Sequence, residues 1–84
     1  MRLDKYLKVS RIIKRRTVAT EACDAGRVTL NGHPVRASYE VKPGEVFTLS
    51  LGQRPVTFRV LAVNEFAGKD DAKLMYEILD TPAE

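Results

Sequence analysis

The first ten residues have the spacing of an amphipathic helix. Leu3, Tyr6 and Leu7 recur at i, i+3 and i+4, which places them on one helix face. The opposite side carries the basic residues Arg2, Lys5 and Lys8. We expect this helix to end near Ser10, with Ile12 and Ile13 leading the chain back onto the core.

A second helix is predicted over residues 18–25. Thr17 is a suitable N-cap, and Gly26 supplies the C-terminal stop. The helix between them carries small apolar residues that suit close packing against the first helix, namely Val18, Ala19, Ala22, Cys23 and Ala25.

After Gly26 the apolar period changes from that of a helix to that of strands. Asn-Gly and Pro-Gly pairs mark turns between the apolar runs. Strands are expected over residues 27–30, 33–36, 46–51 and 56–63, with turns at 31–32, 42–44 and 52–55. Asp70 can cap a short helix through Met75, whereas residues 76–79 fit either a strand or a helix. The pattern predicts an α+β fold in which two N-terminal helices pack on a small, mostly antiparallel sheet of four or five strands.

The length of 84 residues predicts one domain, residues 1–84, with one small core and a frayed tail at 81–84. No apolar run approaches 18 residues, so neither a membrane span nor membrane association is expected. The basic start lacks the apolar stretch of a signal peptide. The single cysteine, Cys23, excludes an internal disulfide and fits a reducing, cytoplasmic location.

The charge is sorted along the chain. Residues 1–16 hold seven bases and one acid, a local charge of +6, whereas the other 68 hold seven bases and ten acids, a charge of −3. A solvated helix face is the plain alternative, but this density favours a nucleic-acid contact. The candidate RNA-binding residues are Arg2, Asp4, Lys5, Lys8, Arg11, Lys14, Arg15 and Arg16.

Lys14, Arg15 and Arg16 stand directly before the second helix. Cations there oppose the positive end of the helix dipole, so the placement is mildly unfavourable in the protein alone. An incoming phosphate reverses the sign of that interaction and also meets free backbone N–H groups. The arrangement therefore indicates an anion site.

Asp4 and Tyr6 have two interpretations each. Asp4 lies in the first helical turn, can pair with Lys8, and fits a helix-start role better than a direct RNA contact. It can serve both roles if it orients Arg16 or another base. Tyr6 could stack on a nucleobase, but its apolar-face position favours the core.

No residue set predicts catalysis, a metal or a cofactor. His33 and Cys23 are too few for zinc or for a Cys–His nucleophile, and we expect a solvated His33 and a packed Cys23. No phosphate-cradling glycine loop is present. Arg27 and Arg36 flank the Asn-Gly turn and extend the RNA surface only weakly.

Four segments together resemble the S4-type RNA-binding domain, the alpha-L motif, over about residues 1–51. They are Met1-Arg2-Leu3-Asp4-Lys5-Tyr6-Leu7, the Arg-Thr pair at 16–17, Gly26-Arg27-Val28-Thr29-Leu30-Asn31-Gly32 and Val41-Lys42-Pro43-Gly44-Glu45-Val46. Each alone is a weak signal, but four in this order are specific. The resemblance implies a helix pair and a small sheet that grip structured RNA.

Within this family, a free-standing chain with Arg-Leu-Asp-Lys and Lys-Arg-Arg-Thr resembles the RqcP-like subfamily of bacterial ribosome-associated quality control. That likeness implies a monomeric, ribosome-associated protein that binds large-subunit rRNA and peptidyl-tRNA. It also implies work with RqcH in adding C-terminal alanine tails to stalled chains. Two alternatives stay open: a heat-shock S4 protein that rescues stalled large subunits without tailing, and the RNA-binding module of an RNA-modifying enzyme. The acidic end of the chain (Glu77, Asp80, Glu84) favours the RqcP-like subfamily, because heat-shock relatives carry a basic extension there.

Overall fold

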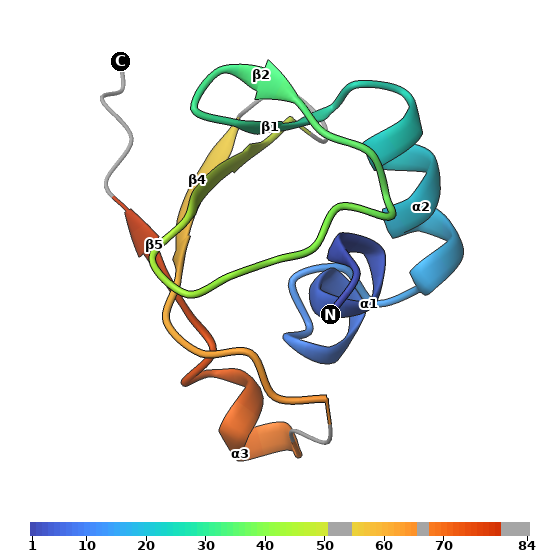
Figure 1. The fold of residues 1–84 in the computed structure, drawn as a ribbon. Coiled ribbons are helices and arrows are strands. Elements are labelled where there is room, and N and C mark those ends of the chain that lie inside the picture. The colour runs from blue at the N-terminus through green and yellow to red at the C-terminus, as the bar shows by residue number, and fades with distance from the viewer. Residues whose placement is uncertain (51–54, 66–67, 80–84) are drawn as a thin grey trace.

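The computed structural model describes residues 1–50, 55–65 and 68–79, apart from the side chain of Lys69 (Figure 1). The helices in these ranges are α1 (Leu3–Val9), α2 (Arg16–Asp24) and α3 (Lys69–Ala72). The strands are β1 (Val28–Leu30), β2 (His33–Pro34), β3 (Val46–Leu49), β4 (Val56–Val60) and β5 (Tyr76–Leu79). None of these helices has the length and apolar content that crossing a membrane requires.

The described strands form one five-stranded antiparallel sheet in the order β2-β1-β3-β4-β5. Helices α1 and α2 pack together and lie on one side of this sheet, while α3 lies at one end, before β5 (Figure 1). The predicted α+β fold, with two N-terminal helices on a small antiparallel sheet, is therefore confirmed.

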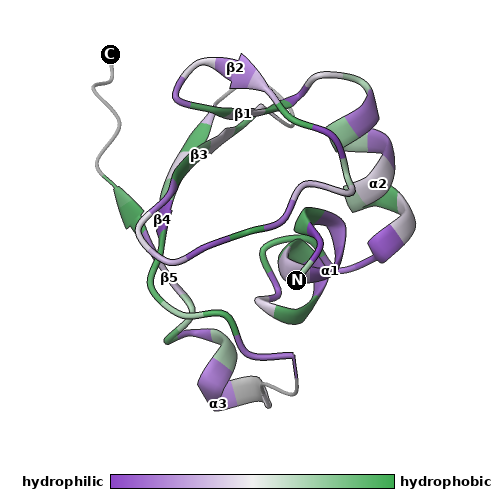
Figure 2. Cartoon of the chain, in the orientation of Figure 1, coloured by the Kyte–Doolittle hydropathy of each residue, from purple (hydrophilic) through white to green (hydrophobic). Residues whose placement is uncertain are grey.

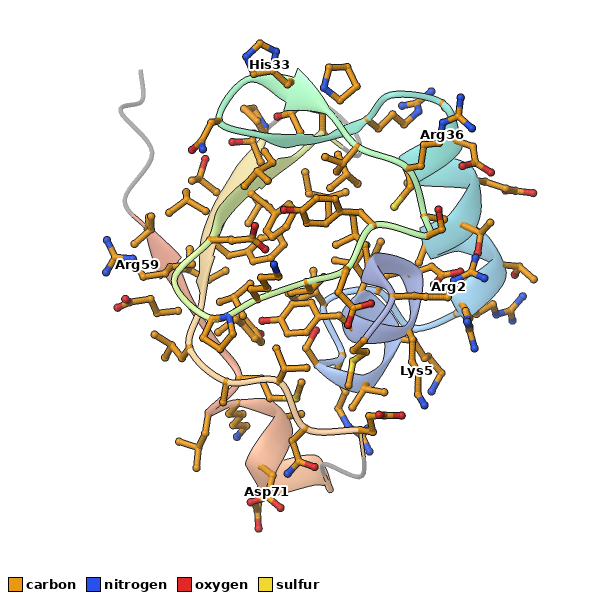
Figure 3. The ribbon with its side chains drawn as sticks, viewed as in Figure 1. Arg2, Lys5, His33, Arg36, Arg59 and Asp71 are labelled. Carbon is orange, nitrogen blue, oxygen red and sulfur yellow. The ribbon has the colours of Figure 1, made fainter. Side chains whose placement is uncertain are left out.

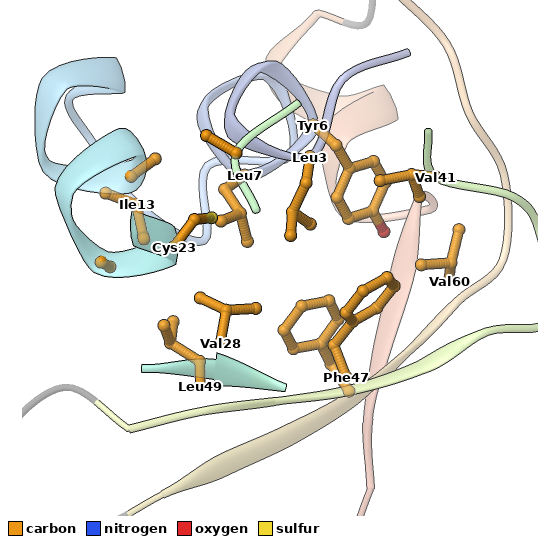
Figure 4. Packing of buried hydrophobic residues seen from close by; sticks show 14 of the residues in the cluster. Leu3, Tyr6, Leu7, Ile13, Cys23, Val28, Val41, Phe47, Leu49 and Val60 are labelled. Carbon is orange, nitrogen blue, oxygen red and sulfur yellow. The ribbon is translucent and has the colours of Figure 1, made fainter. Parts of the chain in front are cut away.

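The core lies between the helices and the inner face of the sheet (Figure 4). Leu3, Tyr6 and Leu7 of α1 are fully buried, as their spacing predicted. The sheet contributes Phe47 and Phe58, which pair directly across β3 and β4. Figure 2 shows hydrophobic and hydrophilic residues on α1 alike, as expected of a helix with one buried face.

Tyr6 is a core residue at both ends of its side chain. Its ring stacks on Phe58 with 6.4 Å between centroids, and Phe58 in turn stacks on Phe47 at 5.7 Å. Its buried hydroxyl donates to the carbonyl of Met75 at 2.8 Å. The core interpretation of Tyr6 is confirmed, because neither its ring nor its hydroxyl is free for a nucleobase.

Backbone groups satisfy the start of α1 and the end of α2. At the start of α1, the N–H groups of Leu3 and Asp4 donate to the carbonyls of Tyr39 and Ala37, at 2.8 and 3.2 Å. At the end of α2, Gly26 has φ +77°, and its N–H bonds the carbonyl of Cys23. The predicted stop at Gly26 is confirmed.

Two predicted caps are wrong. Helix α2 begins two residues earlier than expected, at Arg16 instead of residue 18, so Thr17 lies inside its first turn and Arg15 is the N-cap. Helix α3 begins after Gly68, which places Asp70 inside the helix, and it ends at Ala72. In both cases the helix begins before the predicted cap residue, so the side chains of Thr17 and Asp70 lie past the cap position.

The strand predictions are correct in place but too long. The strand expected over 33–36 is β2, only two residues long, and that over 56–63 ends as β4 at Val60. The N–H groups of Leu61 and Ala62 both donate to the carbonyl of Met75, which breaks the regular pairing and leaves Ala62 exposed. Residues 76–79 form a strand. The end of the strand expected over 46–51, most of the turn at 52–55 and the tail at 81–84 lie outside the described residues.

Candidate nucleic-acid interface

A buried carboxylate joins the two N-terminal helices. Asp4 of α1 has a side chain only 3% exposed, and its oxygens accept from both helices. Thr20 of α2 donates its hydroxyl to Oδ2 at 3.1 Å, and the Lys5 N–H donates to Oδ1 at 2.8 Å. Arg2 donates Nε to Oδ1 and Nη2 to Oδ2, both at 3.3 Å, and Arg16 approaches Oδ1 with Nη2 at 3.5 Å. We call Asp4, Arg2, Arg16 and Thr20 the Asp4 cluster.

The Asp4 cluster keeps its carboxylate ionised. Burial by itself raises the pKa of Asp4, but hydrogen bonds from Thr20, the Lys5 N–H and Arg16 outweigh it, and the pKa falls below its ordinary value. The possible pairing with Lys8 is not formed: among the described residues the carboxylate of Asp4 accepts from Arg2, the Lys5 N–H, Arg16 and Thr20. The expected orientation of Arg16 by Asp4 is present.

Both arginines of the cluster remain open to solvent. Their side chains are 53% exposed in Arg2 and 48% exposed in Arg16. A guanidinium has five N–H donors, and Asp4 takes two from Arg2 and one from Arg16. The carboxylate therefore fixes two cations next to each other while leaving donors that a phosphate can use.

The start of α2 offers a second set of donors. Arg15, the N-cap residue, is extended and makes no side-chain capping bond, and the first turn of α2 contains no acid. The first N–H groups of a helix have no partner within it, and they carry the positive end of its dipole. Lys14 and Arg15 are exposed beside them. The anion site at this helix start stays a prediction, to which the structure adds the exposure of Lys14 and Arg15 and the uncapped start of α2.

The predicted site residues do not all have the same surroundings. Lys5 is held by Glu65, with 2.7 Å between Nζ and Oε1, and its side chain is 35% exposed. This contact also lowers the pKa of Glu65. In contrast, four exposed cations of the set form no ion pair with any described residue: Lys8, Arg11, Lys14 and Arg15.

Arg11 adopts a backbone conformation that normally suits glycine. Its φ is +66°, directly after the C-cap residue of α1, and its N–H bonds the carbonyl of Lys8 at 3.1 Å. An L side chain in this region costs of order 1–2 kcal/mol. The chain thus keeps an exposed cation at a position where folding alone favours glycine.

Figure 3 shows how the labelled charges lie. Arg2 and Lys5 project beside α1 and α2, and Arg36 lies near α2, whereas Arg59 is on the opposite, sheet side. Arg59 pairs with Glu77 across β4 and β5 at 2.8 Å. Arg27 and Arg36 are exposed without an ion pair in the described part of the chain, so both are available to extend the basic surface.

Three parts of the surface were missed from the sequence. Thr20 and Glu65 contact Asp4 and Lys5 from 16 and 60 residues away, and no local pattern marks such partners. A shallow hollow on α2 also adjoins the Asp4 cluster. Its described lining is Arg16, Thr17, Thr20 and Glu21.

The described residues include no group of three or more potential metal ligands among His, Cys, Asp and Glu. Cys23 is buried, and burial, with the charges of Asp4 and Asp24, raises its pKa to about 11. Its thiol is therefore protonated at neutral pH, which agrees with the expected packing role. His33 is exposed in β2, as expected for a solvated side chain.

The comparisons with known proteins agree with this geometry. The family model of the S4 domain matches residues 1–47, which include α1, α2 and the Asp4 cluster. The RQC P-site tRNA stabilizing factor of Bacillus subtilis is 51% identical over 94% of this chain and 92% of its own length. A heat shock protein 15 homolog from Haemophilus influenzae is 28% identical over 92% of this chain but only 60% of its own length.

A solved structure shows the same fold. The trimeric structure of Vibrio cholerae heat shock protein 15 superposes with a TM-score of 0.85 at 29% identity, over 94% of this chain and 81% of that one. Sequence, geometry and fold thus agree, and the chain belongs to the S4 domain family, in the group of the RQC P-site tRNA stabilizing factors.

Proposed function

We propose that this chain is a non-catalytic RNA-binding factor of bacterial ribosome-associated quality control. It binds large-subunit rRNA and the peptidyl-tRNA of an obstructed large subunit, and it acts as a monomer in the cytoplasm. The names of its relatives, RQC P-site tRNA stabilizing factors, support the tRNA and the pathway. Together with RqcH, it supports addition of C-terminal alanine residues to the stalled chain.

The Asp4 cluster is the observation that carries this proposal. Burial of this carboxylate costs desolvation of an ion, and besides Thr20 and the Lys5 N–H it accepts hydrogen bonds from two half-exposed arginines, which favours a role beyond folding alone. The same arrangement gives two guanidinium groups a fixed spacing on the surface. Lys8, Arg11, Lys14 and Arg15 add exposed cations of α1, α2 and their junction that form no ion pair with a described residue, and such a surface suits a folded phosphate backbone.

The protein would act as a clamp. One surface formed by α1, α2 and their junction touches two RNA elements at once, and this favours the ribosomal state in which both are in reach. The tRNA is then stabilised between rounds of alanine addition. No reaction is assigned to the chain itself.

A heat-shock S4 protein that rescues stalled subunits is the second candidate, and the fold likeness to heat shock protein 15 favours it. The chain covers nearly the whole length of the quality-control factor from Bacillus subtilis but a smaller part of the heat shock homolog, which supports the first candidate. The RNA-binding module of a modifying enzyme has no such support.

The test is Asp4→Arg, assayed by co-sedimentation with large subunits and by alanine tailing with RqcH. The variant adds positive charge, so a surface that binds any polyanion would bind at least as well. A surface that depends on the Asp4 cluster should lose both subunit binding and tailing. Asp24→Arg is the matched control, because it makes the same charge change at an exposed residue at the end of α2.

Circular dichroism checks that both variants fold, and the comparison counts only if they do, because Asp4 is buried. If the wild-type protein binds large subunits but does not promote alanine tailing, the result would support the rescue factor over the tailing factor. Normal binding and normal tailing by Asp4→Arg would overturn the clamp.

A further inference from the structure

One exposed acid, Glu21, lies beside the Asp4 cluster, in the same hollow as Arg16 and Thr20. Glu21 follows Thr17 by one turn of α2 and lines the hollow next to Arg16. It forms no ion pair with a described residue, although Arg16 is on the same helix. A carboxylate opposes phosphate binding, so the hollow suits a neutral group that donates hydrogen bonds better than it suits a phosphate.

The residues that line the hollow indicate the chemistry of that group. Thr17 and Thr20 line it, and the single hydroxyl proton of Thr20 is shared between two acceptors, the carboxylate of Asp4 and the carbonyl of Arg16. Arg16 forms one side with a planar guanidinium that is half exposed and held by Asp4. Guanidinium planes stack on nucleobases, and carboxylates accept hydrogen bonds from the N–H groups of base edges.

We propose that this hollow binds one unpaired guanine base of the bound RNA. Glu21 accepts hydrogen bonds from the N1–H and N2–H groups of its Watson–Crick edge, and Arg16 lies against the face of the base. Guanine is the base whose edge presents two adjacent donors to a carboxylate; adenine and cytosine offer one amino group, and uracil offers one imino group. The inference rests on the proposed function, because it needs the RNA backbone to be bound at the Asp4 cluster.

The position of Glu21 makes it a specificity residue. Phosphate contacts fix where RNA lies but carry no base information, whereas an acceptor beside a stacking plane distinguishes bases. The Asp4 cluster would therefore supply affinity and Glu21 the choice of base. Removal of Glu21 should abolish discrimination and should not weaken binding to RNA without guanine.

The test measures binding of uridine pentanucleotides by fluorescence anisotropy, with guanosine, inosine, adenosine or uridine at the centre. Wild type should bind the guanosine oligomer roughly 5- to 100-fold more tightly than the uridine oligomer. Inosine should lie between them, because it lacks the N2 amino group. Amide chemical shifts of Thr17, Thr20 and Glu21 should change with guanosine most.

Glu21→Gln keeps the shape of the side chain but replaces one acceptor oxygen with a donor, so it should bind all four oligomers within about twofold of one another. Asp24→Asn is the matched control on the same helix, outside this hollow, and should retain the guanosine preference. Equal binding of all four oligomers by wild type, or an unchanged preference in Glu21→Gln, would overturn the guanine site. The proposed function fails separately, if Asp4→Arg leaves subunit binding and tailing intact.

Discussion

The guanidinium of Arg16 lies 3.5 Å from the carboxylate of Asp4, and this pair joins the first turn of α2 to the first turn of α1. The carboxylate is buried and the guanidinium is half exposed. Asp4 therefore belongs to the core by its position and to the candidate interface by its partners. We therefore expect a mutation of Asp4 to lower the stability of the fold and a mutation of Arg16 to weaken RNA binding.

Asp4→Asn should reduce the free energy of unfolding at pH 7 by about 1–3 kcal/mol, because it breaks charge-assisted hydrogen bonds at a buried site. The folded-state pKa of Asp4 is lowered from the ordinary value of 3.8, so its contribution is present above that value and is lost as the pH falls through the folded pKa. Urea denaturation at pH 7 and pH 3 checks this. A difference between the proteins that is as large at pH 3 as at pH 7 would contradict it.

Arg16→Ala should weaken RNA and subunit binding about tenfold or more, the effect of losing one charge-assisted contact, and leave the fold intact. Arg59→Ala removes the same charge from the sheet side of the molecule, where Arg59 pairs with Glu77. That control should bind within about twofold of wild type. Equal losses in the two variants, measured by co-sedimentation, would mean that the interface lies elsewhere.

Arg11→Gly should separate folding from binding. Glycine relieves the strain at φ +66°, so the variant should be as stable as wild type or more stable by up to about 1 kcal/mol. The same change removes an exposed cation and should weaken RNA binding severalfold. Arg11→Lys keeps both the strain and the charge and should resemble wild type in thermal denaturation and in binding. A glycine variant that binds RNA normally would show that Arg11 does not contact it.

Binding should depend steeply on salt. If four or five of the basic residues meet phosphates, the logarithm of the binding constant should fall against the logarithm of salt concentration with a slope of about −3 to −4. A filter-binding titration at several KCl concentrations measures the slope. Lys8→Ala combined with Lys14→Ala should make it shallower by about 1 to 2, and a flat response in wild type would exclude the basic surface as the contact.

Tyr6→Phe should affect stability without affecting binding. It removes the buried hydrogen bond to Met75, at a cost of about 0.5–1.5 kcal/mol, and leaves the ring in place against Phe58. Chemical denaturation and RNA anisotropy measured on the same preparation check both parts. Weaker RNA binding at full stability would place the Tyr6 hydroxyl in the interface.

The sequence predicted what depends on local periodicity. The spacing of Leu3, Tyr6 and Leu7 identified the buried face of α1, and the change of period after Gly26 identified the start of the sheet. The prediction from sequence failed where a tertiary contact sets the end of a helix. Thr17 is a good cap by type, yet Arg16 already belongs to α2, where it meets Asp4 across the helix pair.

The candidate site divides in the same way. The run of cations in residues 1–16 was visible as composition, but which of them are available depends on distant partners. Glu65 engages Lys5 from the segment before α3, and Thr20 completes the hydrogen bonds of Asp4. Assignment of the eight predicted residues to RNA remains a prediction, which the variants above test.

The hydrogen bond from Tyr6 to Met75 spans 69 residues of sequence. During synthesis the amino-terminal end of a chain emerges first, so the residues of α1 leave the ribosome long before the carbonyl that fixes their central tyrosine. The N–H groups of Leu3 and Asp4 likewise have no acceptors until the carbonyls of Tyr39 and Ala37 have been made. Helix α1, which carries part of the candidate interface, is thus completed by a segment made 69 residues after its tyrosine, and a nascent chain that stops short of Met75 has not yet fixed that helix on the core.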